Sequence, residues 1–170
     1  MAARPRSVTF GRNAASTTLT PVQRWEGILS PFLLTACSLE SRINPMKSVL
    51  VVDDSTTIRR MVIASLRGLK DLEFQEASNG LEAIEKLAVG TVQLVILDLN
   101  MPDMHGLEVV SFIRKHATFR ALPIIVLTTR GDDASRAAAL AAGASLYITK
   151  PFESAHLTES ARILLNPDAK

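Results

Sequence analysis

The sequence predicts an α/β fold: a five-stranded parallel sheet, doubly wound by five helices. Three short apolar runs end in polar residues, and segments with apolar residues at helical spacing separate them. An apolar run without polar alternation is typical of a strand buried on both faces, as in a parallel sheet. Strands that alternate with helices require right-handed crossovers, which place helices on both faces of the sheet.

The predicted domain begins with a strand over 48–52 and a helix that Ser55 or Thr56 caps. Residues 72–77 follow as an edge strand, because apolar and polar residues alternate there. The apolar residues at one-face spacing on the helix, which we expect to face the core, are Ile58, Met61, Val62, Leu66 and Leu69.

A second helix is predicted between the Asn79-Gly80 turn and Gly90. The central strand covers 92–97, and the helix after it covers about 106–116. The expected apolar face of the second helix consists of Leu81, Ile84, Leu87 and Ala88.

Pro123 opens the third apolar run, and the helix after that run begins near Asp132, whose charge suits the positive end of the helix dipole. Leu140 is the only large apolar residue of this Ala-rich helix. We therefore expect the helix to be held weakly and to be the element that shifts. A strand over 145–149 and a helix over 154–165 complete the domain.

Residues 1–45 do not resemble part of a packed domain, because they are rich in Arg, Ser, Thr and Ala and contain four prolines. Three interpretations stay open: a targeting segment, of organellar type or of lipoprotein type around Cys37, a disordered linker or docking arm, or translated upstream sequence before a true start at Met46. We expect residues 46–167 to form the domain, with no output domain after it.

Composition excludes several classes of protein. Residues 1–45 carry five Arg and two Glu, so the remaining chain is nearly neutral and offers no basic surface for nucleic acid. A single cysteine excludes an intrachain disulfide framework and thiolate-rich metal sites. No apolar run approaches the roughly 18 residues of a membrane-spanning helix, so we expect no membrane insertion.

Polar side chains follow four of the predicted strands: Asp53 and Asp54, Asp98, Thr128, and Lys150. Ligands of open α/β sheets bind outside the carboxyl ends of the strands, so these side chains are expected to form one site. Two carboxylates at 4 Å repel by roughly 4 kcal/mol at an effective dielectric of 20, so three of them require positive charge nearby. Lys150 supplies one charge, and oxygen ligands with room for water suit Mg²⁺. Such a site can accept a phosphoryl group on one carboxylate.

Four motifs carry a resemblance to a known family. They are Val51-Val52-Asp53-Asp54-Ser55, the run LDLNMPDMHG from Leu97 to Gly106, Leu127-Thr128, and Tyr147-Ile148-Thr149-Lys150-Pro151-Phe152. In order and spacing they are similar to the receiver domain of two-component response regulators, and most similar to the stand-alone chemotaxis-type members. The resemblance covers residues 46–165 and implies a flavodoxin-like sheet with strand order 2-1-3-4-5.

The resemblance implies a role for each residue of the predicted site. Asp98 corresponds to the phosphoacceptor, which takes a phosphoryl group from the phosphohistidine of a histidine kinase or a histidine phosphotransfer protein. Thr128 and Lys150 correspond to the residues that contact the phosphoryl oxygens. The implied Mg²⁺ ligands are Asp53, Asp54, Asp98 and the backbone carbonyl of Asn100.

The resemblance also implies a conformational switch. In this family Thr128 moves toward the phosphoryl group, and the aromatic side chain at position 147, here Tyr147, rotates inward. Both movements alter the face formed by the fourth helix, the fifth strand and the last helix, through which an unidentified downstream protein is bound. The bond between Lys150 and Pro151 is expected to be cis.

We expect a cytoplasmic protein, a monomer or a weak dimer, with no enzymatic activity beyond self-phosphorylation and autodephosphorylation. Two positions depart from the usual pattern. Thr129 is larger than the residue that usually follows Thr128, and Arg130 occupies a variable position. We expect both to affect the lifetime of the phosphorylated form.

Two other functions compete with this interpretation. A haloacid dehalogenase-type phosphatase also uses Mg²⁺ and a strand-end Asp, but it requires a second acid where this chain has Asn100. A receiver-like interaction module that no longer uses phosphate would retain the fold without the chemistry. A nucleotide or flavin binder would need a Gly-rich loop after a strand, which the sequence lacks.

Overall fold

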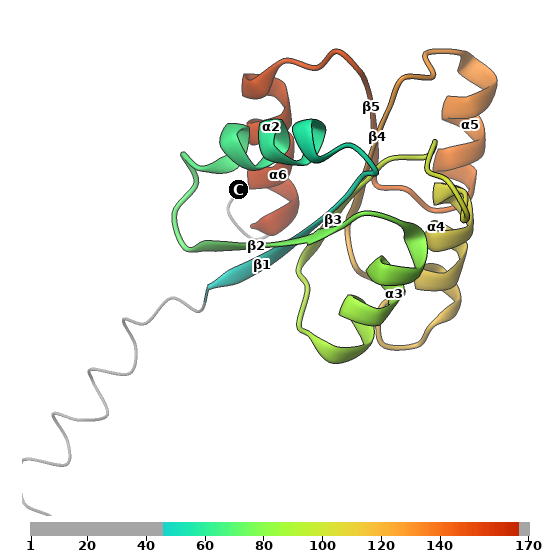
Figure 1. Ribbon diagram of the computed structural model, residues 1–170, viewed down its shortest axis with the longest axis horizontal. Coiled ribbons are helices and arrows are strands. Elements are labelled where there is room, and N and C mark those ends of the chain that lie inside the picture. The colour runs from blue at the N-terminus through green and yellow to red at the C-terminus, as the bar shows by residue number, and fades with distance from the viewer. Residues whose placement is uncertain (1–45, 167–170) are drawn as a thin grey trace, which may run out of the picture. The chain divides into compact units, whose positions relative to one another are not determined.

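The structure, a computed structural model, describes residues 46–166, in which five strands alternate with five helices (Figure 1). The elements in chain order are β1 (Lys47–Val52), α2 (Thr56–Leu66), β2 (Leu72–Ala77), α3 (Gly80–Val89), β3 (Leu94–Leu97), α4 (Gly106–Lys115), β4 (Ile124–Thr128), α5 (Asp133–Ala141), β5 (Leu146–Thr149) and α6 (Ser154–Leu165).

All neighbouring strands pair in parallel, and their order is β2-β1-β3-β4-β5. This order confirms the predicted doubly wound α/β fold. It places β1 and β3 side by side in the sheet, with Val52 opposite Leu97. The residues that follow these two strands therefore come out of the sheet as neighbours.

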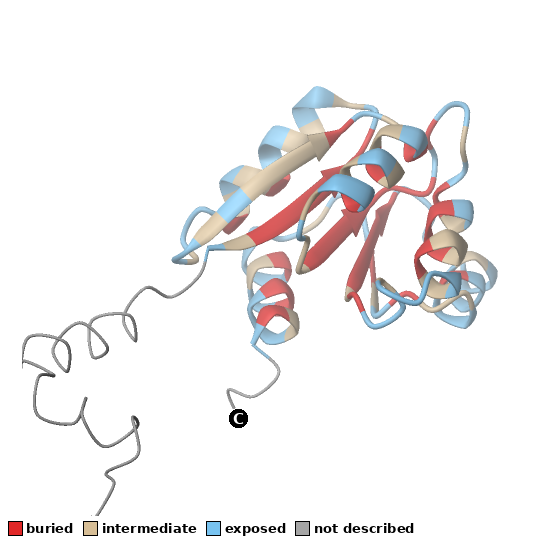
Figure 2. Ribbon diagram, turned by 90° about the horizontal axis from the view of Figure 1, so that it is seen from below, coloured by how far each residue is buried: buried red, intermediate tan, exposed pale blue. Residues whose placement is uncertain are grey.

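Successive residues of the central strands point to opposite faces of the sheet, and both faces are covered. Leu50 and Val52 join the cluster under α3, α4 and α5, whereas Val49 and Val51 join the cluster under α2 and α6. Figure 1 shows these two helical layers on either side of the sheet, and Figure 2 shows burial concentrated along the strands between them. The unbroken apolar runs of the sequence are explained by this double burial.

The predicted core faces of the first two helices require correction. Met61 is 51% exposed and Leu81 is 60% exposed, and Ala88 is exposed as well. The predicted core residues Val62, Leu66 and Leu87 are buried, and Ile58 and Leu69 pack against the core. In α3 the buried residues besides Leu87 are small, namely Gly80 and Ala83. A Cβ at Gly80 would lie 2.7 Å from the Met104 sulfur and 2.8 Å from a methyl carbon of Val109 on α4, so the glycine allows close packing against that side chain and α4.

Helix α5 is held weakly, as its composition predicts. Ala139 is its only buried residue, and Leu140, the expected anchor, is 43% exposed. The Asp132 side chain caps the helix by accepting a hydrogen bond from the Ser135 amide at 2.8 Å. The cap and one alanine contact therefore replace the broad apolar face that the other helices bury.

Within residues 46–166, every helix is too short or too polar to cross a lipid bilayer. The interpretations of residues 1–45, and the end of the predicted domain at 167, lie outside the described residues.

Candidate functional site

The carboxyl ends of the strands open into a cavity of about 530 Å³. Its wall contains most of the predicted site residues and an apolar side formed by α2 and the loop after β5. The lining residues are Asp53, Asp54, Ser55, Ile58, Met61, Asp98, Asn100, Thr129, Lys150, Pro151 and Phe152. The cavity lies where ligands of open α/β sheets bind.

The turn between β1 and α2 positions the first two carboxylates. The Asp53 amide donates to the Ala77 carbonyl at 3.1 Å, which extends the pairing of β1 with β2 by one residue. The Asp53 side chain is buried and accepts a hydrogen bond from the Ser55 amide at 2.9 Å. Asp54 is exposed at the cavity, and Ser55 caps α2, which settles the choice between Ser55 and Thr56.

Asp98 follows β3 and is 6% exposed. Its amide donates to the Val52 carbonyl at 2.9 Å, so its backbone is fixed against the end of β1. Its Oδ2 lies 3.2 Å from the Lys150 ammonium, but its Oδ1 is buried and has no hydrogen-bond partner. A buried carboxylate oxygen without a partner is costly, so this atom indicates a site for a cation or a reacting group.

Lys150 brings the only positive charge that contacts these carboxylates in the described part of the chain. Its ammonium lies 2.6 Å from Asp53 Oδ2 as well as 3.2 Å from Asp98 Oδ2. The following bond, Lys150–Pro151, is cis, as the resemblance implies. One ammonium balances one of the three carboxylates and leaves the site with a negative charge.

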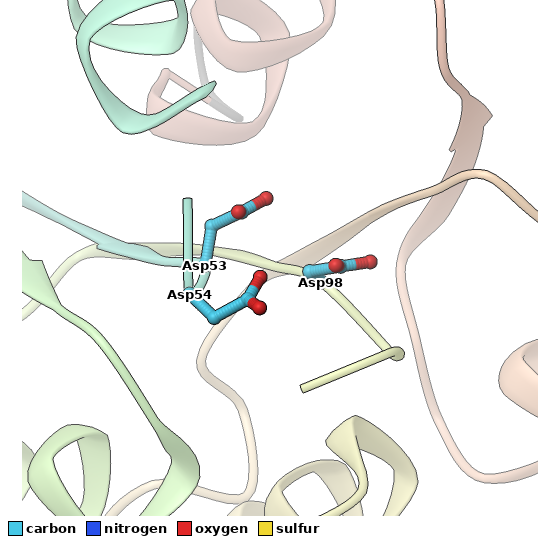
Figure 3. A group of neighbouring side chains, drawn as sticks. All are labelled: Asp53, Asp54 and Asp98. Carbon is cyan, nitrogen blue, oxygen red and sulfur yellow. The ribbon is translucent and has the colours of Figure 1, made fainter. Parts of the chain in front are cut away.

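The three carboxylates fit a hard divalent cation. Asp53, Asp54 and Asp98 each offer an oxygen, and these atoms lie within 4.8 Å of one another (Figure 3). The donor set consists entirely of carboxylate oxygen, and in Asp98 the Oδ1 atom has no other partner. This chemistry suits Mg²⁺ and does not suit a thiolate- or imidazole-preferring metal. The backbone carbonyl of Asn100 stays a predicted ligand.

Burial raises the pKa of the Asp53 carboxyl above its ordinary value of 3.8, and the Asp98 charge raises it further. The hydrogen bonds from Lys150 and Ser55 oppose this shift but do not cancel it. The charged form of Asp53 is therefore destabilised in the folded protein when no metal is bound.

Replacing Asp53 by Asn is therefore expected to stabilise the metal-free protein at neutral pH by about 1 kcal/mol. Because the folded pKa is raised, folded Asp53 binds more protons than the unfolded chain, and stability falls as pH rises from the unfolded to the folded pKa. The gain in stability from Asp53→Asn should be complete above the pKa of Asp53 in the folded protein, and it should shrink as the pH falls toward the ordinary pKa of 3.8. Thermal unfolding in EDTA across this range measures it.

The exposed neighbour offers the control for this prediction. Asp54→Asn removes the same charge from an exposed position and should change the unfolding temperature less. An unchanged or lower unfolding temperature for Asp53→Asn would show that the Lys150 ion pair outweighs the burial of Asp53.

The predicted switch residues are connected by hydrogen bonds. The side-chain nitrogen Nδ2 of Asn100 donates to the Thr128 hydroxyl at 3.1 Å and to the Thr129 hydroxyl at 3.2 Å. The Arg130 backbone amide also donates to the Thr128 hydroxyl, at 3.4 Å. The Tyr147 hydroxyl donates to the Arg130 carbonyl at 2.7 Å, and burial raises the pKa of Tyr147. Tyr147 is 4% exposed, and its inward rotation on phosphorylation stays a prediction.

Sequence reasoning did not assign several residues of the site. Ile58 packs against the core as expected but also lines the cavity, whereas Met61, expected in the core, is exposed and lines the cavity, and Phe152 completes its apolar side. The Asn100 side chain was given no role. Asn100 lies two residues after Asp98, and β3 and β4 are neighbours in the sheet, so the loop after β3 lies beside Thr128 and Thr129 at the end of β4. The strand order is therefore the information that would have assigned this contact.

Comparison with known proteins agrees with this geometry. The sequence profile of the response regulator receiver domain matches residues 49–162. The chain is 42% identical over 118 residues to "Chemotaxis protein CheY1" of Helicobacter pylori, covering 69% of this chain and 95% of that protein. It is 43% identical over 105 residues to "Chemotaxis protein CheY homolog" of Campylobacter jejuni, covering 61% of this chain and 81% of that protein.

Solved structures show the same fold. Chemotaxis response regulator CheY4 of Vibrio cholerae matches with a TM-score of 0.65 and 34% identity, over 70% of this chain and 98% of that one. The Mn²⁺-bound form of response regulator Rcp1 matches with a TM-score of 0.60 and 26% identity, over 71% of this chain and 92% of that one. With the acidic cavity, the cis bond and the strand order, these matches show that the chain belongs to the response regulator receiver domain family, with chemotaxis-type relatives in two-component signalling.

Proposed function

We propose that the domain is a phosphorylation-dependent signalling switch, in which Asp98 accepts a phosphoryl group from the phosphohistidine of a histidine kinase or a histidine phosphotransfer protein. The observation that carries this proposal is the buried Asp98 Oδ1, which has no hydrogen-bond partner in a residue that lines the cavity beside Lys150. The similar response regulator Rcp1 has a Mn²⁺-bound form, and this supports the proposal that the three carboxylates of this chain bind a divalent cation.

In the proposed reaction a carboxylate oxygen of Asp98 attacks the phosphorus atom. The bond from phosphorus to the imidazole nitrogen breaks, and its electron pair stays on that nitrogen, which leaves an acyl phosphate on Asp98. Lys150 is already 3.2 Å from this carboxylate and is positioned to stabilise charge on the transferred group. Thr128, the last residue of β4, is buried outside the cavity lining, and its hydroxyl accepts hydrogen bonds from Asn100 Nδ2 at 3.1 Å and from the Arg130 backbone amide at 3.4 Å. In the proposed switch it moves from this position toward the phosphoryl group.

Asp53, Asp54 and Asp98 would hold Mg²⁺, with the Asn100 carbonyl as a further ligand. When bound, Mg²⁺ neutralises charge on the phosphoryl oxygens and on the three acids. The burial of Asp53 and the exposure of Asp54 fit this role, because one ligand is fixed by the fold while the other stays accessible to the incoming ion.

The output of the switch is proposed to be the face formed by α5, β5 and α6, which binds a downstream protein. Tyr147 on β5 is connected through the Arg130 carbonyl to the loop after Thr128, so a movement of Thr128 reaches this face directly. The weak anchoring of α5 supports such a movement. We propose cytoplasmic action, because phosphohistidine donors of this class act there, and no enzymatic activity beyond phosphorylation and dephosphorylation of Asp98 itself.

Incubation of the full chain with Mg²⁺ and acetyl phosphate tests the proposal. Intact mass spectrometry is expected to show a labile gain of one phosphoryl group, which is absent when EDTA is added. If neither acetyl phosphate nor a histidine kinase produces this gain, the phosphate-independent interaction module becomes the better description of the domain. Turnover of free phosphate esters without accumulation of the modified protein would instead indicate the phosphatase.

A further inference from the structure

The two acids after β1 lie on a turn with few internal restraints. Asp54, between Asp53 and Ser55, is exposed, and the hydrogen bonds of the turn are made by its first and last residues: the Asp53 amide donates to the Ala77 carbonyl, and the Ser55 amide donates to the Asp53 side chain. Three carboxylates that share one lysine repel one another, so an unrestrained turn would move Asp53 and Asp54 away from Asp98. Something outside the turn is needed to hold it in position.

Arg59, in the first turn of α2, donates a hydrogen bond from each of its three side-chain nitrogens, and one of these bonds reaches back to the turn after β1. Its Nη1 donates to the Asp53 backbone carbonyl at 2.8 Å, and its Nε donates to Glu76 Oε2 on β2 at 2.8 Å. Its Nη2 donates to the Thr56 hydroxyl at 3.2 Å. The Arg59 side chain is 12% exposed, whereas the Glu76 side chain is 43% exposed and Thr56 is exposed, so the bond to the Asp53 carbonyl is the most buried of the three.

The partners of Arg59 come from different elements. Glu76 lies on the edge strand, where it is opposite Val51 in the register, and Thr56 begins α2. The planar guanidinium donates in a fixed geometry, so Glu76 on one side determines where its other nitrogens point. The Asp53 carbonyl is thereby tied to the sheet edge and to the helix at once.

We propose that Arg59, oriented by Glu76, is a positioning residue of the metal site: it holds the turn after β1 so that Asp53 and Asp54 stay within coordinating distance of Asp98. This inference rests on the proposed Mg²⁺ site and extends it beyond the ligands. Outer residues that orient metal ligands are commonly worth about 10- to 100-fold in metal affinity.

Whether Mg²⁺ affinity rises or falls when Arg59 is removed distinguishes a positioning role from a purely electrostatic one. Arg59 is a cation beside the metal site, so its removal on charge grounds alone would strengthen Mg²⁺ binding. Loss of positioning would weaken it. We expect Arg59→Ala to raise the Kd for Mg²⁺ roughly tenfold, although the variant site is more negative.

The test is a titration of the full-length protein with MgCl₂ alone, followed by backbone amide chemical shifts and with no phosphoryl donor present. Arg60→Ala is the matched control, because this neighbouring arginine on α2 is exposed and should leave the Kd unchanged. Glu76→Gln keeps a hydrogen-bond acceptor for Arg59 and should bind Mg²⁺ nearly as the unmodified chain does. Glu76→Ala removes the acceptor and should weaken binding, although both substitutions remove the same charge.

Each outcome decides the matter. A Kd that is unchanged or lower in Arg59→Ala, or equal losses in Glu76→Gln and Glu76→Ala, would overturn the positioning role while Mg²⁺ binding by the unmodified protein stands. If the unmodified protein shows no saturable shifts with MgCl₂, the metal site itself and this inference fail together. Unfolding temperatures of the variants in EDTA show whether the fold is intact.

Discussion

Asp98→Asn is expected to lose the phosphoryl gain completely in the intact-mass experiment with Mg²⁺ and acetyl phosphate. An amide oxygen is a far poorer nucleophile than a carboxylate oxygen, so the attack on phosphorus does not occur. The replacement keeps the size of the side chain, and the hydrogen bond from the residue 98 amide to the Val52 carbonyl does not involve the side chain. The loss therefore reports on chemistry and not on the fold.

A second acid in the same loop provides the control for this experiment. Asp103 is exposed and has a positive φ of 70°, a conformation that Asn adopts readily, so Asp103→Asn should be phosphorylated like the unmodified chain. A phosphoryl gain that persists in Asp98→Asn would place the acceptor on another residue. The assignment of Asp98 would then be wrong even if the protein is a phosphorylated switch.

Gly106→Ala is expected to destabilise the fold by about 1–3 kcal/mol, which denaturant unfolding can measure. A Cβ at this position would overlap the Asp98 backbone carbonyl and lie 2.8 Å from the Leu99 Cα. Both neighbours are backbone atoms, which cannot rotate away as a side chain can. Relief requires that the start of α4 or the loop after β3 moves, and the second movement displaces Asp98.

Gly68→Ala is the matched control, because a Cβ there has no heavy atom of another residue within 4 Å. Its stability should change by no more than about 0.5 kcal/mol. If the two variants unfold at the same denaturant concentration, the close approach of Gly106 to the Asp98 loop is not a constraint on the fold.

The architecture was predictable because burial on both faces leaves a plain mark in the sequence. The three unbroken aliphatic runs correspond to β1, β3 and β4, and the alternating run corresponds to the edge strand β2. Which side of a helix meets the sheet was less predictable. Leu81 is exposed whereas Gly80 and Ala83 are buried, and Gly80 lies so close to Met104 and to Val109 on α4 that a Cβ would not fit without a shift. Small residues at such a contact carry no apolar signal in the sequence.

The site was predictable only in part. Carboxylates at strand ends could be assigned to one edge as soon as the strands were known to be parallel, and Asp53 and Asp98 do meet at Lys150. The contacts of Arg59 and Asn100 could not be assigned in this way. Both residues act through side chains that cross between elements, and those crossings depend on register and helix rotation that composition does not determine.

The shallow burial of α5 has a consequence for how a partner would be recognised. A helix that buries only Ala139 and packs partly through Ala142 is expected to detach at a low cost in free energy, so its amide hydrogens should be among the least protected in the domain. A binding protein can shift such an equilibrium only by the difference between its affinities for the two positions of the helix. Each factor of ten in that difference corresponds to about 1.4 kcal/mol. Small movements around Asp98, at the carboxyl ends of the strands, are then sufficient to alter which side chains α5 presents to a partner.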